Sequence, residues 1–398
     1  MSEHAPIENH TIVIIGGGTA GITVAARLRR ADPALDVAVV EPSERHFYQP
    51  LWTLVGAGLY RRADSERAEA DFIPKGVTWV RDRAAAVDPV RKTVDLEGGG
   101  RLGYEQLVVA PGIRLAWERI DGAEEALGHD GVATNYDPRF VDRTFGMLDA
   151  VSEGTALFTF PAGPIKCAGA PQKIMWLADH LFRRKGIRDG TNVVFASAGS
   201  RIFGVEKYRV ALEALVQARG IDTRFGHELI ALRPRSREAV FRHGDEERIL
   251  RYDFVHVAPP QAPPAFIAES DLGDEGGWVD VDKCNLQHRK YPDVFSLGDA
   301  SSLPTSKTGA AVRKQAPVLV ENLLAHRAGR PLVAAYDGYS SCPLTTRYGR
   351  VILAEFDYDG RPAETFWFDQ AKERWSMWVL KTQVLPRLYW YGMLRGRA

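Results

Sequence analysis

Cys167 is the residue whose surroundings most clearly favour thiol chemistry. It lies between Lys166 and Lys173, and Pro171 suits the first position of a helix that residues 174–182 continue. Nearby positive charge and a helix N-terminus lower the pKa of a thiol and favour the reactive thiolate. The pattern therefore predicts a redox-active or nucleophilic cysteine.

The other two cysteines carry no comparable local signal. Cys342 is expected in a loop before a strand over residues 350–356, and Cys284 in a charged loop. Three cysteines are too few for a disulfide scaffold, and in a reducing compartment a pair is more often redox-active than structural. Composition alone favours inert thiols.

The N-terminal segment predicts a strand, a turn, a helix and a second strand. The apolar run at residues 11–15 is typical of a buried parallel strand. A helix is expected over residues 20–30 and a second strand over residues 36–40. Between the first strand and the helix stands Gly16-x-Gly18-x-x-Gly21, which is the dinucleotide-binding pattern in its proper setting.

Each residue of this pattern has a physical task. Gly16 makes the tight turn, Gly18 lets the backbone approach a pyrophosphate, and Gly21 permits close helix–strand packing. The helix N-terminus stabilises the phosphate charge, and Glu41 at the end of the second strand accepts hydrogen bonds from ribose hydroxyls.

A distant segment favours FAD over NAD as the bound dinucleotide. Residues 291–300 read as a strand that ends in Gly298-Asp299, which resembles the second FAD signature of two-dinucleotide-domain flavoproteins. There the aspartate holds a ribityl hydroxyl of the flavin. Residues 108–112 resemble the strand and turn that close the first FAD segment in that group. Taken alone, Gly298-Asp299 is also compatible with an ordinary turn.

A second such unit is expected, without a working nicotinamide site. Residues 192–196 read as its first strand, but Ser197 stands for the first glycine and Ile202 for the third. A β-branched side chain there obstructs close helix–strand packing. Only Gly199 remains, so the electrons are expected to come from a donor other than NAD(P)H, with the cysteines as candidates.

The chain resembles sulfide:quinone oxidoreductases, particularly the group that contains the mitochondrial enzyme. The resemblance covers nearly the whole chain. The segments that carry it are residues 46–54, 166–173, 304–308, 341–344 and 350–358.

We therefore expect an α/β fold with two Rossmann-like dinucleotide-binding-type domains, the FAD/NAD(P)-binding flavoprotein fold, plus a C-terminal helical, membrane-facing segment. The FAD-binding domain is expected to be discontinuous, over residues 1–120 and 283–335. Residues 121–282 are expected to form the second domain, and residues 336–398 the C-terminal segment.

For the site, the resemblance implies that Cys167 and Cys342 face each other on one side of the flavin and cycle through a disulfide, with or without an extra bridging sulfur. The catalytic lysines fall on Lys173 and Lys381. Glu125 matches a pocket acid by local spacing alone. No metal site is expected. The expected FAD contacts are Gly16, Gly18, Thr19, Ala20, Gly21, Glu41, Gln49, Ala84, Gly298, Asp299 and Lys307.

The implied reaction follows thiol–disulfide chemistry. Hydrogen sulfide, as hydrosulfide, attacks the bridge; Cys342 carries the persulfide, and Cys167 is the leaving thiolate next to the flavin. Two electrons reach FAD and then a ubiquinone-type quinone. The sulfane sulfur leaves to a small acceptor: sulfite, a thiol, cyanide or sulfide.

The C-terminal stretch predicts contact with a membrane surface. From residue 372 onward six Lys/Arg face a single acid, Glu373, and are interleaved with Trp and Tyr, as at a headgroup interface. Pro386 should break the stretch into two short helices. The alternative is a helix that packs on the core with its aromatics buried.

Charge and hydropathy limit the function further. Lys plus Arg number 51 and Asp plus Glu also 51, so nothing favours nucleic acid. No run reaches a spanning length, and the polar N-terminus shows no signal peptide, so peripheral or monotopic association with an inner or cytoplasmic membrane is expected. A homo-oligomer is compatible with the sequence. The rival functions are a type II NADH:quinone dehydrogenase and a non-enzymatic flavin-binding protein.

Overall fold

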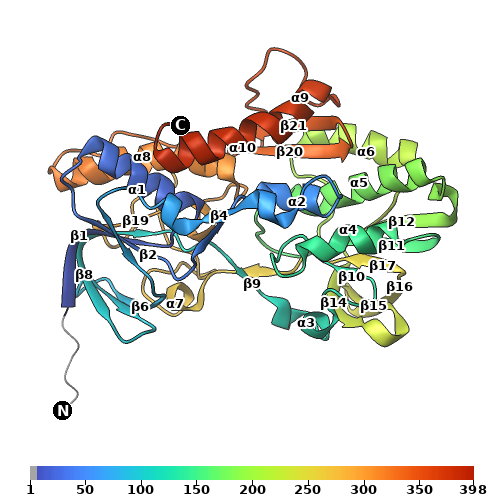
Figure 1. Cartoon of the computed structure of the whole chain (residues 1–398), viewed down its shortest axis with the longest axis horizontal. Coiled ribbons are helices and arrows are strands. Elements are labelled where there is room, and N and C mark those ends of the chain that lie inside the picture. Colours follow the sequence, from blue (N-terminus) through green and yellow to red (C-terminus); the bar gives the residue numbers. More distant parts are fainter. Residues whose placement is uncertain (1–6) are drawn as a thin grey trace.

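The structure is a computed structural model that describes residues 7–398, so the first six residues of the polar N-terminus lie outside it. Its first sheet has a parallel core in the order β5–β2–β1–β8, with β19 also paired to β8 (Figure 1). An antiparallel hairpin, β6–β7, extends the sheet beyond β8. The strands are β1 (Ile7–Ile15), β2 (Val37–Val40), β5 (Val77–Val80), β6 (Ala84–Asp88), β7 (Thr93–Leu96), β8 (Arg101–Val109) and β19 (Val294–Ser296).

The predicted strand–turn–helix unit is present. Residues 12–15 of β1 are fully or almost fully buried, as a parallel strand covered on both faces requires. Helix α1 (Thr19–Ala31) follows, and it lies beside α8 (Gly309–Arg327) over one face of the sheet (Figure 1). Because β19 joins this sheet from far along the chain, the first domain is discontinuous in sequence; its exact boundaries stay a prediction.

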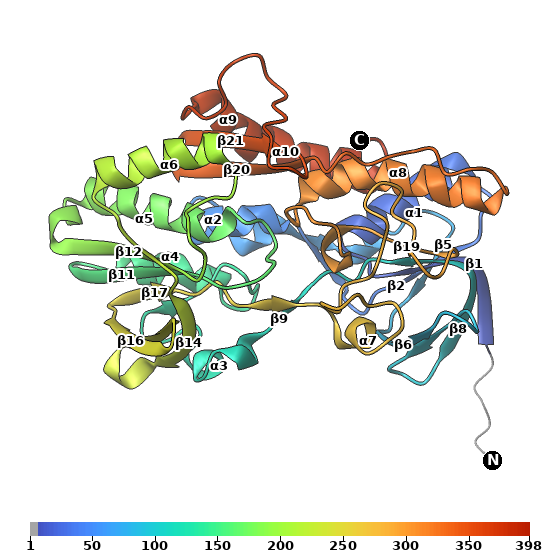
Figure 2. The same cartoon turned by 180° about the vertical axis from the view of Figure 1, so that it is seen from behind.

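The second sheet is parallel throughout, in the order β10–β17–β11–β12–β13. Helices α5 (Ala170–Lys185) and α6 (Glu206–Arg219) lie above it, and an antiparallel sheet of β14, β15 and β16 with α3 (Ala123–Ala126) lies below (Figures 1 and 2). The strands are β10 (Val132–Ala133), β11 (Gly154–Phe160), β12 (Thr191–Ser197), β13 (Asp222–Phe225), β14 (Glu228–Arg233), β15 (Glu238–His243), β16 (Glu246–Arg251) and β17 (Phe254–His256).

Shorter elements connect the two sheets. Strand β9 (Arg114–Leu115) pairs with β18 (Gln261–Ala262) where the chain crosses between the domains. The remaining short strands and helices are β3 (Arg45–Phe47), β4 (Glu66–Ala68), α2 (Trp52–Val55), α4 (Val141–Asp149) and α7 (Ala265–Ala268).

The order of strands corrects the sequence analysis of the second domain. In the first sheet β1 lies between β2 and β8 and leads through α1 to β2. In the second, β11 lies between β12 and β17 and leads through α5 to β12. The counterpart of β1 is therefore β11. The prediction that residues 192–196 form the first strand of this domain is wrong, because β12 is the counterpart of β2. The loop that corresponds to the glycine motif is residues 161–169, here called the thiol loop, and it contains Cys167.

The C-terminal segment begins with a hairpin of β20 (Ser340–Arg347) and β21 (Arg350–Phe356). Cys342 lies on β20 opposite Ala354, so its predicted loop position is wrong. Helical turns then run from Trp375 to Arg395: α9 (Trp375–Val379), a π-turn, α10 (Leu385–Arg387), a second π-turn and a 3-10 turn.

The expected break at Pro386 is also wrong. Proline lies in the first turn of α10, and the residues on both sides keep helical dihedral angles. The wider π-turns that flank α10 (Leu380–Val384 and Leu388–Gly392) carry the helical path past a residue that cannot donate a backbone hydrogen bond.

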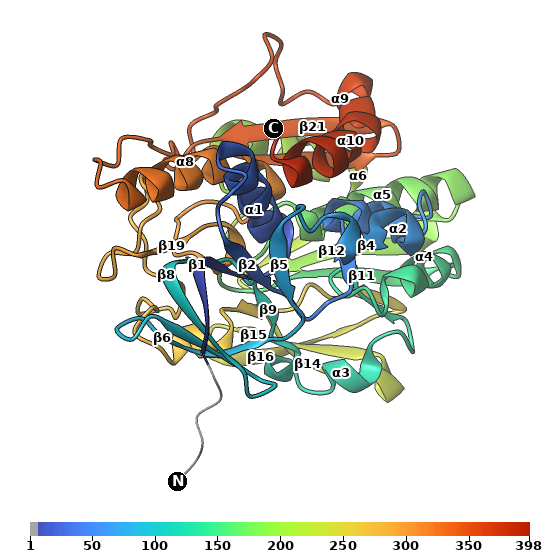
Figure 3. The same ribbon diagram turned by 60° about the vertical axis from the view of Figure 1, so that its left-hand side comes forward.

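The last turns pack on the core, contrary to the expected headgroup position. Trp390 and Leu394 belong to the main hydrophobic cluster, although Tyr391 is exposed. The buried Tyr389 hydroxyl lies 2.8 Å from Thr19 Oγ1 and 2.6 Å from His46 Nε2. Figure 3 shows the turns that follow α10 reaching α1, and the last of them, Met393–Arg395, packs on that helix. The alternative, a helix packed on the core, is the correct one for these turns.

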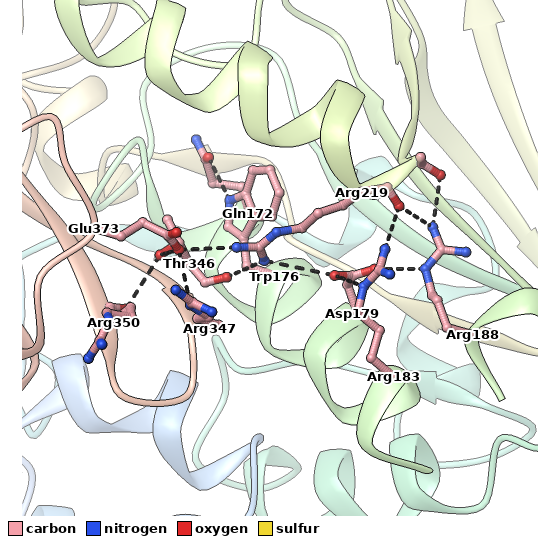
Figure 4. A network of polar contacts seen from close by, with 11 residues as sticks. Gln172, Trp176, Asp179, Arg183, Arg188, Arg219, Thr346, Arg347, Arg350 and Glu373 are labelled. Carbon is pink, nitrogen blue, oxygen red and sulfur yellow. Dashed lines mark hydrogen bonds and ion pairs between the residues drawn. The ribbon is translucent and has the colours of Figure 1, made fainter. Parts of the chain in front are cut away.

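A buried ionic network fixes the β20–β21 hairpin against α5 and α6 (Figure 4). Asp179 on α5 is fully buried and pairs with Arg183 at 3.1 Å and Arg188 at 2.7 Å. Arg219 at the end of α6 contacts the Thr346 carbonyl on β20 and pairs with Glu373 at 3.1 Å. Because α5 follows Cys167 and β20 carries Cys342, this network holds the two thiol-bearing elements in a fixed relation.

Within residues 7–398, no helix combines the length and the apolar character that crossing a bilayer requires.

Candidate functional site

Two cysteines that are distant in sequence meet between the domains. The sulfur atoms of Cys167 and Cys342 lie 3.7 Å apart, and this thiol pair is formed by the thiol loop and strand β20. Cys284 lies exposed in a turn, as expected. A small movement is enough to close a disulfide between the pair, since both sulfurs already face each other.

The backbone holds Cys167 in an unusual conformation. Its φ is +57°, in the left-handed region that non-glycine residues rarely adopt. The amide donates to the Lys307 carbonyl at 2.8 Å, and the carbonyl accepts from Ala170 N at 2.7 Å, where α5 begins. These two hydrogen bonds offset the strain and direct the sulfur toward Cys342.

Charge around the thiol pair favours a thiolate on Cys167. The hydrogen bond between the two sulfurs and the Lys173 ammonium, whose Nζ donates to Cys167 Sγ at 3.1 Å, lower the pKa of Cys167 well below the usual thiol range. The same sulfur contact and burial raise the pKa of Cys342. The pair is therefore asymmetric, with Cys167 as the better leaving group.

Lys381 adds a second buried amine. It is only 5% exposed and lies in the π-turn after α9. Burial, together with the charge of Lys173, lowers its pKa to about 7. An amine with this pKa exchanges a proton readily near neutral pH.

Two further residues lie next to the pair, Tyr136 and Lys166, and of these Tyr136 carried no sequence signal. Tyr136, which follows β10, is buried, and burial and the charge of both cysteines raise the pKa of its hydroxyl. Lys166 donates to Gln49 Oε1 at 2.8 Å and lies 5.7 Å from the Tyr136 ring. Burial lowers the pKa of Lys166 to about 8. Tyr136 could not be found from sequence because only the pairing of β10 with β17 brings it to the site.

The glycine loop of the first domain fits a dinucleotide. Gly16 has φ +100°, and a Cβ there would collide with the Ala110 carbonyl; a Cβ on Gly21 would collide with the Gly16 carbonyl. At Gly18 no atom lies within 4 Å of the place a Cβ would occupy. The first turn of α1 has no acidic residue and no side-chain cap, so the N–H groups at Thr19 and its successors are free to bind phosphate.

Glu41 lies against the glycine loop, and its role as the ribose-binding residue stays a prediction. Its carboxylate accepts from Gly17 N at 2.7 Å and from Ser43 N at 2.8 Å, and burial raises its pKa. Its amide donates to the Val80 carbonyl at 3.0 Å, which places the chain leading to Ala84 beside it. The roles of Ala20 and Ala84 as FAD contacts stay predictions.

The second FAD signature lies next to the thiol loop. Gly298 has φ +70° and donates to Gln315 Oε1 at 2.9 Å, and Asp299 follows it. Lys307 donates to the Asp299 carbonyl at 2.7 Å, while its own carbonyl accepts from Cys167 N. One short segment therefore connects the flavin side of the first domain with the reactive thiol.

Glu125 is not brought to this site. It is exposed on α3, on the side of the second domain opposite the C-terminal helices (Figure 1). Helix α3 packs on β14, so the loose spacing match does not make Glu125 a pocket acid.

The comparisons with known proteins agree with this geometry. Residues 10–140 match the family model described as pyridine nucleotide-disulphide oxidoreductase. The chain is 46% identical over 393 residues to the mitochondrial sulfide:quinone oxidoreductase of Mus musculus, covering 98% of this chain and 87% of that protein. It is 47% identical over 399 residues to the same-named protein of Dictyostelium discoideum, covering 99% and 88%. The solved sulfide:quinone oxidoreductase of Aquifex aeolicus superposes with a TM-score of 0.83 at 19% identity, covering 98% of this chain and 92% of that one.

A glycine-loop cradle in one α/β domain and a thiol pair against the other define an FAD-dependent disulfide oxidoreductase. Its cofactor is FAD, which supplies two-electron redox chemistry. At this level of identity over nearly the whole length, the chain belongs to the sulfide:quinone oxidoreductase family.

Proposed function

We propose that this protein oxidises hydrogen sulfide at the Cys167–Cys342 pair and delivers the electrons through FAD to a membrane quinone. The observation that carries the proposal is the asymmetric pair itself: two sulfurs 3.7 Å apart, with Lys173 Nζ 3.1 Å from Cys167. An inert pair of thiols has no need of a buried ammonium directed at one sulfur.

The oxidised pair is the starting state for turnover. Hydrosulfide attacks Cys342 of the disulfide, forms a persulfide there and releases Cys167 as a thiolate. The low pKa of Cys167 makes it the favoured leaving group. Transfer of the outer sulfur to an acceptor frees the Cys342 thiolate, and re-formation of the bond between the two cysteine sulfurs releases two electrons that FAD accepts.

The lysines act on charge and protons. Lys173 stabilises the thiolate that each attack releases, through its 3.1 Å contact. Lys381, with a pKa of about 7, takes up or gives a proton beside the pair as sulfide enters and anions form.

The type II NADH dehydrogenase alternative is disfavoured by the thiol loop. In the first domain residues 16–18 connect β1 to α1, and this short turn leaves the helix N-terminus open to phosphate. In the second domain residues 161–169 connect β11 to α5 and contain only Gly163 and Gly169, without the G-x-G-x-x-G spacing. Cys167 stands where a nicotinamide nucleotide would place its pyrophosphate.

A visible spectrum of the purified holoprotein titrated with sulfide tests the proposal. Sulfide should bleach the oxidised flavin and NADH should not. Cys167→Ser should abolish the bleaching while FAD stays bound, and Cys284→Ser, a change in the exposed turn, is the matched control. Sulfide turnover near the wild-type rate in Cys167→Ser would falsify the assignment.

Quinone reduction also requires contact with a membrane, and we place that contact on the exposed part of the C-terminal segment. Trp367 is 96% exposed, Trp375 62% and Tyr391 68%. The same segment also exposes the basic Arg387 and Arg395, and exposed Trp and Tyr together with basic side chains suit a peripheral, one-face attachment.

A further inference from the structure

One ammonium reaches from the second domain to the first beside the thiol pair. Lys166 belongs to the thiol loop, and its Nζ donates to Gln49 Oε1 at 2.8 Å in the turn that leads into α2. Its amide donates to Gln261 Oε1 at 2.8 Å, and its backbone forms a parallel bridge with Lys307. Contacts of the side chain and of the backbone therefore fix the position of this charge.

The chain does not neutralise the charge of Lys166. Among residues 7–398 no carboxylate oxygen lies within 4.0 Å of its Nζ. Asp299 and Asp137 are the two acids whose charges act on it, and Asp137 is itself paired with Arg139 at 2.6 Å. A desolvated ammonium without a counter-charge costs free energy unless an anion comes to lie beside it.

The residues around this ammonium are those expected to hold the flavin. Gln49 and Asp299 are both expected FAD contacts, and Asp299 is the one expected to hold a ribityl hydroxyl. Lys166 donates to Gln49 and lies within the field of Asp299, and Cys167 follows it in the chain. A flavin that Asp299 holds and that Cys167 reduces is therefore expected within reach of the Lys166 charge.

We infer that Lys166 sets the reduction potential of the flavin by placing a positive charge beside its ring. The inference rests on the proposed function, in which re-formation of the bond between the two cysteine sulfurs supplies two electrons. FAD accepts these two electrons and one proton from solvent, so the reduced cofactor carries one more negative charge than the oxidised one. A neighbouring cation stabilises the added charge and raises the potential. The lysines on the two sides of Cys167 then have separate roles, because Lys173 stabilises the thiolate and Lys166 the reduced flavin.

The test is a spectroelectrochemical titration of the flavin in the purified holoprotein. All samples carry Cys167→Ser and Cys342→Ser, so that only the flavin takes up electrons. At the midpoint potential of this background, Lys166→Met should lower the ratio of reduced to oxidised flavin about tenfold, which for two electrons is a shift of about 30 mV. Lys166→Arg keeps the charge and should change the ratio less than about threefold. Lys290→Met is the matched control: it removes an exposed ammonium paired with Asp271 at 2.9 Å and should leave the ratio unchanged.

Lys166→Gln separates the charge from the shape of the side chain. It can still donate to Gln49, so it should retain FAD and lower the ratio as Lys166→Met does. An unchanged ratio in Lys166→Gln would contradict the inference, and an equal fall in Lys166→Arg would show that something other than charge acts on the flavin. The failure of the proposed function is distinct, because in that case sulfide would not bleach the flavin of the wild-type protein.

Discussion

Replacing Lys173 by methionine should raise the proton affinity of Cys167. The ammonium nitrogen lies 3.1 Å from the sulfur and the lysine is only 5% exposed, so its charge is poorly screened. Coulomb's law at this distance gives about 1.3 kcal/mol at the dielectric constant of water and about 5 kcal/mol at an effective value of 20. Since about 1.4 kcal/mol corresponds to one pKa unit, the proton affinity should rise at least about tenfold.

The assay is the alkylation rate of Cys167 as a function of pH in the reduced holoprotein, measured by mass spectrometry of its peptide. A Cys284→Ser background removes the exposed competing thiol, while Cys342 is fully buried. The midpoint of the rate profile reports the pKa of Cys167 whatever the nucleophilicity of its thiolate. For Lys173→Met the midpoint should move up toward that of an ordinary thiol.

Lys166→Met is the matched control. Its ammonium is on the residue next to Cys167, yet it donates to Gln49 Oε1. The midpoint in this variant should move much less. If Lys173→Met leaves the midpoint unchanged, or if Lys166→Met moves it equally, the thiolate is stabilised by something other than the contact at 3.1 Å.

Four further changes have defined outcomes. Lys381→Met should stabilise the fold by roughly a few kcal/mol below pH 7 and little near pH 10.5. In the folded wild-type protein the pKa of Lys381 is lowered to about 7 from 10.5. Between these two pH values the unfolded state therefore binds more protons than the folded state, and the free energy of unfolding decreases as the pH falls. Urea unfolding at about pH 6 and about pH 10 measures this difference. The double change Trp367→Ser and Trp375→Ser should weaken co-sedimentation with anionic liposomes at least about tenfold, because burial of each large apolar side chain contributes about 1.5–3 kcal/mol of free energy. Unchanged sedimentation would place the membrane contact elsewhere. Truncation after Pro386 should release FAD, and Tyr389→Phe should raise the FAD dissociation constant, since the lost hydroxyl contacts Thr19 at the glycine loop; full FAD retention by the truncated protein would contradict this.

The first domain could be predicted well because its signals are local. The glycine pattern is set mainly within one strand–turn–helix unit: Gly16 needs its positive φ for the turn, and a Cβ on Gly21 would collide with the Gly16 carbonyl. The helix expected over residues 20–30 is observed as α1, one residue longer at each end. Gly298-Asp299 was recognisable for the same reason, because a turn after a buried strand is encoded in adjacent residues.

The second domain was misassigned because strand order is not a local property. Residues 154–160 and 191–197 are both apolar runs followed by small residues, and only the pairing of β11 with β17 shows which of them lies at the centre. The same limit applies to Cys342, whose partner Ala354 is reached across a hairpin. Nothing near Cys342 in the sequence marks it as reactive, since Lys173 and Cys167 arrive from another element.

The two domains use one structural unit for two kinds of chemistry. In the first, a short turn of glycines leaves the N-terminus of α1 open to a phosphate. In the second, the longer thiol loop places Cys167 near the N-terminus of α5, with Lys173 on the first turns of that helix. The Cys167 thiolate is stabilised there by the contact with Cys342 and by the ammonium of Lys173. Because the thiol loop lacks the G-x-G-x-x-G spacing that brings a pyrophosphate to the helix, we expect sulfide, and not NADH, to reduce the flavin of this chain.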